Sequence, residues 1–309
     1  METYNIDNIS HLGGNCMATV GMFDGVHAGH RHIIERLNTE AGRRGLEPVV
    51  VTFDTHPRIV LGKADGGFAL LSTADERCRL LADAGVRNML QLHFSADLAR
   101  LSACEFLRSV LVEKLGVCAL LTGYDNQFGN RAAADFDRLP EEARQLGVEL
   151  LTDSAVLVGG LEVSSTRVRH ALVEGNVELA AALLGRRYAA TGSVVLGRQV
   201  GRTMGFPTAN IELPDRLKAL PANGVYAAVA TAGAKSYPAM ANIGAQPTFG
   251  QTTTAFEVHL IGFEGDLYGQ QLTVQFVRRL RPIRRFGSAD ELRQQLKTDL
   301  TNTLLCTNS

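Results

Sequence analysis

Short apolar runs alternate with helix-length segments along the first part of the chain. The runs fall at residues 16–22, 48–53, 86–93, 117–122 and 148–152. The run at residues 48–53 is continuous, which is typical of a parallel strand covered on both faces. Segments with helical spacing lie at about 31–43, 73–84, 102–115, 141–146, 164 onward and 177–184. This alternation predicts a Rossmann-like α/β domain around a mostly parallel, doubly wound sheet.

Several of these helices carry boundary signals. Thr73 precedes Glu76 by three residues and Ser102 precedes Glu105 by three, which is the spacing of a capping box. Gly45 lies just past the first helix, where a left-handed C-cap is expected. The helices are therefore predicted to begin and end at defined residues.

The pattern changes after residue 185, where a short helix stops at a glycine. Helical spacing then disappears, and short β-rich runs separated by Gly, Pro and Asn take over. These runs are residues 189–196, 225–232, 238–243, 255–263 and 271–280. They predict a small antiparallel β-barrel. We therefore expect two domains, 1–185 and 186–309.

A C-terminal helix completes the second domain. Ser288 and Glu291 form a further capping pattern, and Leu292, Leu296 and Leu300 follow at a spacing of four. This apolar stripe is expected to pack on the barrel.

Most of the chemistry-bearing residues of the first domain lie between its first strand and first helix. His27 and His30 stand there among three glycines and one acid, Asp24. A strand–turn–helix exposes N–H groups and a positive dipole end that attract phosphate, and imidazoles there could stabilise charge on a reacting polyphosphate. No Gly-Lys-Ser/Thr follows, so this is not a Walker A loop. A plain βα turn is the structural alternative.

Polar clusters follow two further strands and open a later helix. Residues 54–58 and 123–129 fall at strand carboxyl ends, where open α/β sheets bind ligands. Residues 164–169 read Ser-Ser-Thr-Arg-Val-Arg, with hydroxyls suited to capping and arginines suited to phosphate. A capped strand end and a simple N-cap are the alternatives.

The second domain has its own glycine-rich connection, residues 197–205. Glycines let backbone N–H groups close around phosphates. Thr208 and Asn210 follow and offer hard oxygens suited to Mg²⁺ beside a nucleotide. A hairpin connection is the alternative.

Glu257 lies in a run whose period-2 pattern puts it on the same face as His259. If that face were the barrel interior, a carboxylate there would need a task, and a general base is one. An ordinary exposed strand residue is the alternative.

Composition limits the possible partners and the cellular compartment of the protein. The chain has 309 residues, 45% hydrophobic content and a net charge of −1, which gives no support for nucleic acid or membrane as a partner. Five cysteines without a C-x-x-C pair indicate a reducing compartment. With no apolar run of about 18 residues and no basic, apolar leader at the N-terminus, a cytoplasmic protein is expected. The oligomeric state is left open.

Taken together, the motifs resemble those of the bacterial bifunctional riboflavin kinase/FAD synthetase (FMN adenylyltransferase) family. In the first domain the resemblance rests on residues 21–30, 52–57, 123–129 and 164–169. In the second it rests on residues 201–211, 223–226, 242–244, 247–249, 257–259 and 266–269. A His-x-Gly-His turn alone would indicate only the wider adenylyltransferase superfamily. Its combination with Gly-Phe-Pro-Thr-Ala-Asn is specific.

The resemblance implies two reactions that use ATP and Mg²⁺. The C-terminal domain would phosphorylate riboflavin to FMN, with Glu257 as base and Thr208 and Asn210 as metal residues. The N-terminal domain would adenylylate FMN to FAD, releasing pyrophosphate, with His27, His30 and Arg167 in catalysis. Nucleotide-binding residues would be Gly21, Phe23, Asp24, Gly25, Gly29, Ser164, Ser165, Thr166, Gly201, Arg202, Gly205 and Pro207. Flavin-binding residues would be Asp54, Asp125, Asn126 and Arg281, the last from an arginine cluster that otherwise resembles solvated surface.

The sequence departs from the family pattern at three places. Thr55 replaces a usual proline, residues 130–135 are shorter and less glycine-rich than usual, and Gly262 replaces a common aspartate. Two other readings stay open. One is a different adenylyl- or cytidylyltransferase with an accessory β domain, against which Thr208, Asn210 and Glu257 argue. The other is a non-enzymatic flavin-binding regulator, against which the paired histidines argue.

Overall fold

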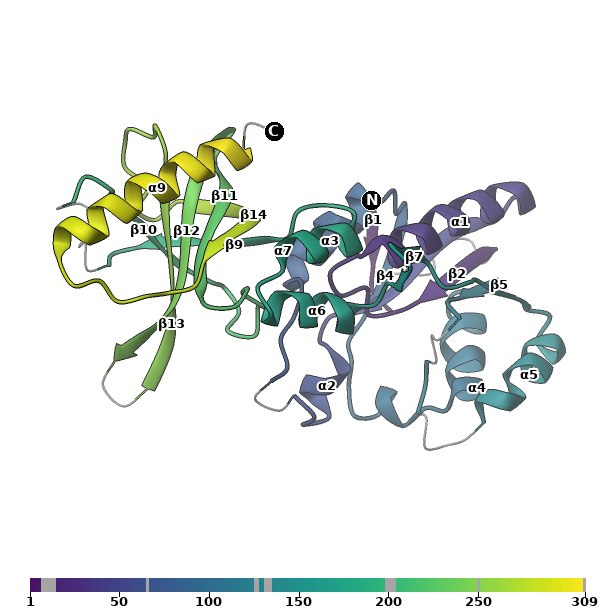
Figure 1. The fold of residues 1–309 in the computed structure, drawn as a ribbon. Helices are drawn as coiled ribbons and strands as arrows, with labels where there is room; N and C mark the ends of the chain where they lie inside the picture. The colour runs from purple at the N-terminus through teal and green to yellow at the C-terminus, as the bar shows by residue number, and fades with distance from the viewer. Residues whose placement is uncertain are drawn as a thin grey trace. The chain divides into compact units, whose positions relative to one another are not determined.

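The structure, a computed structural model, describes residues 1–6, 15–64, 67–124, 128–130, 135–197, 204–248 and 251–307, with backbone alone at 245–248 and 251–253. The chain divides into two compact units, Met1–Ser164 and Ser165–Ser309 (Figure 1). The first unit is built on a sheet with helices, and the second on a barrel with helices.

A six-stranded sheet forms the centre of the first unit, in the order β1-β4-β3-β2-β5-β6. All its strand pairs are parallel. The chain runs outward from β2 through β3 and β4 on one side and through β5 and β6 on the other. Open sheets of this kind bind ligands at the carboxyl ends of the strands where the order reverses. The strands are β1 (Glu2–Tyr4), β2 (Cys16–Val20), β3 (Glu47–Phe53), β4 (Asn88–Leu92), β5 (Val117–Thr122) and β6 (Glu149–Thr152).

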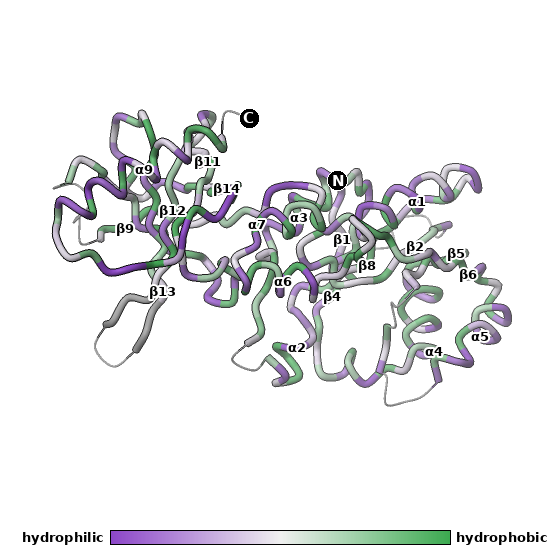
Figure 2. Tube along the Cα trace, viewed as in Figure 1, coloured by the Kyte–Doolittle hydropathy of each residue, from purple (hydrophilic) through white to green (hydrophobic). Residues whose placement is uncertain are grey.

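Helices cover both faces of this sheet (Figure 1). Met17 and Val50 belong to the core formed with α1 and α3, whereas Ala18 and Val51 belong to the core formed with α4. Successive strand residues thus face opposite layers, as strand geometry requires, and hydrophobic colouring follows the central strands in Figure 2. The helices are α1 (Ala28–Arg44), α2 (Pro57–Val60), α3 (Ala74–Asp83), α4 (Ala103–Phe106) and α5 (Leu139–Gln145), with a short hairpin of β7 (Leu157–Val158) and β8 (Leu161–Glu162).

The predicted helix boundaries are largely confirmed. Both capping boxes form, with Thr73 and Ser102 as N-caps of α3 and α4. Gly45 adopts the left-handed conformation that ends α1, with φ of 65°. Two differences appear. Helix α1 begins at Ala28 because His27 caps it. The segment expected as one helix over 102–115 passes from α4 into a π-helix, η3 (Leu107–Val112).

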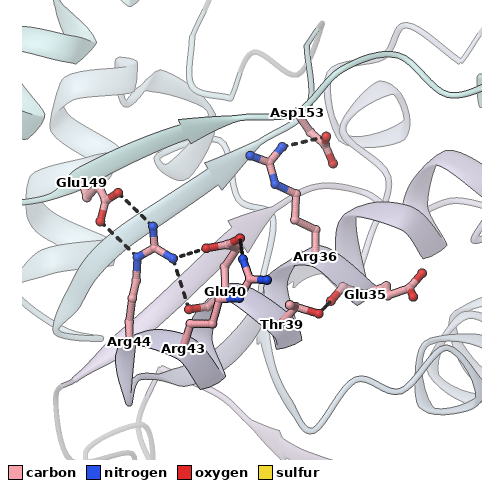
Figure 3. Close-up of polar contacts among 8 residues, drawn as sticks. All are labelled: Glu35, Arg36, Thr39, Glu40, Arg43, Arg44, Glu149 and Asp153. Atoms are coloured by element: carbon pink, nitrogen blue, oxygen red, sulfur yellow. Dashed lines mark hydrogen bonds and ion pairs between the residues drawn. The ribbon is translucent and has the colours of Figure 1, made fainter.

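Ion pairs fasten the outer face of α1 to β6 (Figure 3). The Arg44 guanidinium donates to both carboxylate oxygens of Glu149, at 3.0 and 3.2 Å, and also to Glu40 on its own helix. Near the other end of β6, Arg36 donates to Asp153 at 2.7 Å. The Asp153 carboxylate is almost fully buried, so this pair is screened less than a surface pair. These contacts fix α1, and with it the turn that precedes α1.

The second unit is built on a closed antiparallel barrel in the order β10-β13-β12-β11-β14-β9. Its strands are β9 (Ala189–Val195), β10 (Ala209–Glu212), β11 (Gly224–Ala232), β12 (Lys235–Thr248), β13 (Gln251–Leu260) and β14 (Gln271–Arg281). The antiparallel barrel predicted from the sequence is confirmed. The sequence did not reveal β10, a short strand that closes the barrel by pairing with both β9 and β13.

Among the described residues, this unit also contains the helices α6 (Ser165–Val173), α7 (Val177–Leu184) and α9 (Ala289–Thr307). Helix α9 packs across β11, β12 and β14, as its leucine stripe predicts. The α6–α7 turn is held on the barrel by Arg279, which donates to the carbonyls of Glu174 and Asn223. The compact unit therefore begins at Ser165, earlier in the chain than the boundary at 185 where the sequence pattern changes.

Candidate functional sites

The turn between β2 and α1 brings the two histidines together. His27 is the N-cap of α1, and its Nδ1 accepts from the backbone N–H of His30 at 3.3 Å. The two rings stack with centroids 3.6 Å apart and an angle of 15° between their planes. His27 is buried and His30 is half-buried beside the ring of Phe23. Both imidazoles therefore lie at a helix N-terminus, where the backbone favours an anion.

The backbone of this turn is strained. Phe23 and Val26 have φ of 51° and 38°, values that side chains with a Cβ rarely adopt. Gly25 has φ of 78°, and a Cβ there would lie 2.8 Å from Leu71 Cδ1. A Cβ on Gly29 would lie 3.2 Å from the His27 ring, so this glycine leaves room for the stacked imidazoles. Strain of this kind persists only where surrounding contacts enforce it.

Asp24 makes contacts that hold the turn in its strained conformation. Its carboxylate accepts the backbone N–H groups of Leu71 and Ser72 at 3.0 and 2.9 Å and the Ser72 hydroxyl at 3.1 Å. The Ser72 hydroxyl in turn accepts the N–H of Gly25 at 2.9 Å. The carboxylate is thus directed into the protein. It joins the turn to Leu71 and Ser72, the residues that precede α3 in the sequence.

Arg77 of α3 links this region to the turn after β3. Its side chain is 3% exposed and donates to the carbonyl of Phe53 at 2.5 Å. Burial lowers the pKa of the Arg77 guanidinium, and the nearby carboxylates of Asp24 and Asp54 oppose that shift. The buried guanidinium thus ties α3 to the carboxyl end of β3.

Asp54, predicted to bind flavin, is engaged by the ends of β3 and β4. Its carboxylate accepts the N–H of Phe94 at 3.1 Å and lies 2.6 Å from His93 Nδ1. Burial opposes ionisation, but the hydrogen bonds from His93 and from the N–H groups of Phe94 and Thr55 outweigh it, so the pKa of Asp54 is lowered. His93 had no spacing in the sequence that recommended it, because its partner is 39 residues away.

Of the remaining residues predicted for the adenylyl-transfer site, some are described by the structure and some are not. Ser164 ends the first unit, and Ser165, Thr166 and Arg167 open α6, with Thr166 and Arg167 exposed. Asp125 and Asn126 lie outside the described residues.

Two of the residues predicted for a kinase site, Asn210 and Glu257, meet where β10 pairs with β13. Asn210 stands directly opposite Glu257, and Ala209 stands opposite Val258. Directly opposed residues in a sheet point to the same face with their Cβ atoms about 5 Å apart. The Asn242 amide of β12 donates to Glu257 Oε2 at 3.3 Å, so the carboxylate has a donor from the other neighbouring strand as well.

This face is not the barrel interior that the sequence pattern allowed. Phe256, Val258 and Leu260 are buried and fill the barrel, whereas Glu257 and His259 are half-buried on its outer side. There they line a cavity of about 480 Å³ together with Thr208. The other lining residues include Met204, Phe206, Asn242, Arg281, Phe286 and Leu296. The carboxylate thus faces a hollow large enough for a ligand.

A second cavity of about 620 Å³ lies on the other side of Thr208. Pro207 and Thr208 line it, with Phe263, Asp266 and Tyr268 from the segment between β13 and β14. Thr208 borders both cavities, whereas Phe206 lines only the first and Pro207 and Ala209 line only the second. Gly205 precedes these residues with φ of 83°, and Gly201 and Arg202 lie outside the described residues.

Arg281, predicted to bind flavin, forms a buried pair with α9. Its guanidinium donates to Asp299 at 2.8 and 2.9 Å, and the Asp299 side chain is 1% exposed. Gln295 donates to the same carboxylate at 2.8 Å. The pair fixes α9 against β14, and α9 contributes Leu292 and Leu296 to the first cavity. Sequence spacing could not pair Arg281 with Asp299, because the contact depends on where α9 lies.

Among the described residues, no group of three or more His, Cys, Asp or Glu side chains could hold a metal ion. Thr208 just before β10, Asn210 on β10 and Glu257 on β13 nevertheless offer hydroxyl, amide and carboxylate oxygens. Such hard oxygen donors suit Mg²⁺, which is commonly held by few protein ligands with substrate phosphates completing the shell.

Family models match both halves of the chain. The model described as FAD synthetase matches residues 10–167, and the model described as riboflavin kinase matches residues 184–306.

Curated relatives match the chain over nearly its whole length. The protein named bifunctional riboflavin kinase/FMN adenylyltransferase in Escherichia coli K12 is 39% identical over 285 residues, covering 92% of this chain and 90% of the relative. The protein of the same name in Pseudomonas fluorescens is 39% identical over 292 residues. That of Listeria monocytogenes is 31% identical and covers 94% of this chain.

A solved structure titled macrolide-efflux protein from Streptococcus pneumoniae has a TM-score of 0.86 and 33% identity, and the match covers 98% of this chain and 99% of that chain. The two chains therefore share both compact units. In the part of the chain that the structure describes, no helix is long and apolar enough to cross a membrane.

Proposed function

This chain belongs to the bifunctional riboflavin kinase/FMN adenylyltransferase family, and on that premise we propose which residues carry out each of its two reactions. The enzyme phosphorylates riboflavin with ATP to give FMN, and it adenylylates FMN with ATP to give FAD and pyrophosphate. We assign FMN adenylylation to residues 1–185 and riboflavin phosphorylation to residues 186–309. The two family matches, at 10–167 and 184–306, support that assignment.

Glu257 is the general base of the kinase in this proposal. An alcohol is a poor nucleophile, so the 5′-hydroxyl of the ribityl chain benefits from an acceptor for its proton. The observation that carries the assignment is the position of Glu257 opposite Asn210, at the edge of a cavity that Thr208 also lines. The amide of Asn242 donates to one carboxylate oxygen and leaves the other available to the substrate hydroxyl.

Thr208 and Asn210 would hold Mg²⁺ in this proposal, because Asn210 stands opposite Glu257 across the two strands and Thr208 lines the same cavity as that carboxylate. The ion, when bound, offsets the negative charge of the ATP phosphates. The chain itself positions the two reactants. Phosphoryl transfer depends chiefly on such positioning and on charge stabilisation.

We assign the flavin to the first cavity and the nucleotide to the second. The first cavity has apolar walls from Met240, Phe286 and Leu296 next to the proposed base, which suits a flat aromatic ring. The second is lined by Pro207, which lies two residues after Gly205, and by Tyr268. Thr208, which borders both, stands where phosphate would pass from one substrate to the other. Arg281 then serves the flavin side by fixing α9 through Asp299.

The adenylyltransferase requires a different arrangement. The phosphate of FMN is already anionic, so transfer needs in-line positioning and stabilisation of charge more than a base. His27 and His30 at the N-terminus of α1 are proposed to stabilise the ATP phosphates, with Arg167 as a further cation and Ser164, Ser165 and Thr166 as nucleotide contacts. Gly21, Phe23, Asp24, Gly25 and Gly29 would shape the turn, since Asp24 and the glycines set its backbone.

A reducing, cytoplasmic location completes the proposal. None of the five cysteines forms a disulfide in the described part of the chain, which supports a compartment where thiols stay reduced.

One assay tests the metal assignment. The purified protein is incubated with riboflavin, ATP and graded Mg²⁺, and the flavins are separated by chromatography. Thr208→Ala and Asn210→Ala should raise the Mg²⁺ concentration needed for FMN formation, by roughly tenfold for a lost oxygen ligand. FAD formation from supplied FMN should keep its wild-type Mg²⁺ dependence. An unchanged requirement for FMN formation in both variants would refute the metal assignment.

A further inference from the structure

His259 stands two residues beyond Glu257 on β13, yet the reaction described above gives it no task. Its Nδ1 lies 2.7 Å from the carbonyl oxygen of Pro207. Its ring also packs edge-on against Phe206, with centroids 5.5 Å apart. Both contacts fall on the residues that immediately precede Thr208.

The direction of the hydrogen bond follows from its acceptor. A carbonyl oxygen can only accept, so Nδ1 of His259 must carry the hydrogen. Proline has no N–H, so Pro207 contributes only this carbonyl to any backbone interaction. The contact is therefore a single, directed bond from a side chain to the main chain, between residues 52 positions apart.

The Pro207–Thr208 segment lies where the strand ladder has not yet begun. The pairing of β10 with β13 starts at Ala209 opposite Val258 and continues at Asn210 opposite Glu257. Ladder hydrogen bonds thus set Asn210, but they stop short of Thr208. The hydrogen bond from His259 lies just before the start of the ladder. It holds the main chain next to Thr208 against β13.

We propose that His259 is a positioning residue of the kinase reaction, which sets Thr208 between the two cavities by holding the Pro207 carbonyl. The proposal rests on the role assigned above to Thr208. His259 acts through the Nδ1 side of its ring, and its effect reaches the reaction only through the main chain of Pro207 and Thr208.

Two substitutions distinguish the two ring nitrogens. The amide nitrogen of asparagine can take the place of Nδ1, and that of glutamine extends toward the place of Nε2. His259→Asn should therefore keep the bond to Pro207, and His259→Gln should lose it. Each variant is assayed for the KM of ATP and the Mg²⁺ requirement in FMN formation. FAD formation from supplied FMN controls for the amount of intact first domain, and the His259→Asn variant controls for folding of the barrel.

His259→Gln should raise the KM for ATP and the Mg²⁺ requirement by roughly tenfold, the loss expected for one directed hydrogen bond, and His259→Asn should restore both to within about threefold of wild type. In a Thr208→Ala background, His259→Gln should add little, because both changes then affect one group. Fully additive effects, or an asparagine variant no better than the glutamine variant, would overturn the role of His259. A Thr208→Ala protein with wild-type Mg²⁺ and ATP dependence would instead overturn the proposed metal residue itself.

Discussion

Asn210 and Glu257 lie directly opposite one another across β10 and β13, with their side chains on the outer face of the barrel. A hard amide oxygen and a carboxylate are thereby placed side by side by the register of two strands. Behind Asn210 lies Gly197, where a Cβ would come within 1.9 Å of Asn210 Nδ2. The position of the asparagine depends on the absence of a side chain at 197.

Gly197→Ala should therefore displace Asn210 and impair the kinase. The clash is far closer than any real Cβ contact, so the asparagine must move or β10 must shift. FMN formation should fall by at least roughly tenfold, while FAD formation from supplied FMN stays unchanged. Steady-state assays of both steps check this. Unimpaired FMN formation would mean that Asn210 need not hold its observed position.

His27 should serve both the fold and the reaction, and two substitutions separate these roles. His27→Asn keeps an N-cap acceptor, whereas His27→Ala loses it and should destabilise α1 by about 1 kcal/mol. Both should slow FAD formation by roughly a hundredfold, because both remove an imidazole from the proposed phosphate site. Urea unfolding and FAD synthesis are measured side by side. Wild-type FAD synthesis by the asparagine variant would show that His27 acts only as the N-cap of α1.

Asp24 should be required for the folded turn. Its carboxylate accepts from two backbone N–H groups and one hydroxyl, and Asp24→Ala would leave all of them buried without an acceptor. The free energy of unfolding should fall by about 3 kcal/mol. Asp24→Asn retains one acceptor oxygen and should be milder. A change below about 0.5 kcal/mol for the alanine variant would contradict this structural role.

The Asp54–His93 contact should be visible in a titration. Because the pKa of Asp54 in the folded protein is lowered, its ionised form stabilises the fold above the unfolded value of about 3.9 and loses that effect as the pH falls through the lower, folded value. His93→Ala should raise the pKa of Asp54 toward its ordinary value. The stability gap between the two proteins should narrow below about pH 4. Carboxyl NMR of Asp54 measures the shift, and identical titrations would refute the contact.

The sequence predicted those features that depend on neighbours along the chain. The turn at residues 21–30 and the capping boxes of α3 and α4 follow from local residue chemistry, and all are present. The start of α1 was placed too late, because a histidine is an uncommon N-cap and the apolar spacing begins only at Ile33.

The features that the sequence could not supply depend on distant pairing. β10 is only four residues long, and its place opposite Glu257 is set by the closure of the barrel. The same reason explains why Glu257 was considered for the interior, since period 2 says which residues share a face but not which face is buried. The Asp54–His93 and Arg281–Asp299 contacts likewise depend on the packing of separate elements.

If one chain carries two separate sites of phosphoryl and adenylyl transfer, Glu257→Gln should affect only one of them. The glutamine is close in size to glutamate, but it is a far weaker proton acceptor. The variant is given riboflavin in one reaction and FMN in another, each with ATP and Mg²⁺. FMN formation should fall by at least roughly a hundredfold, while FAD formation from supplied FMN should match wild type. Undiminished FMN formation, or a parallel loss of both activities in folded protein, would contradict this expectation.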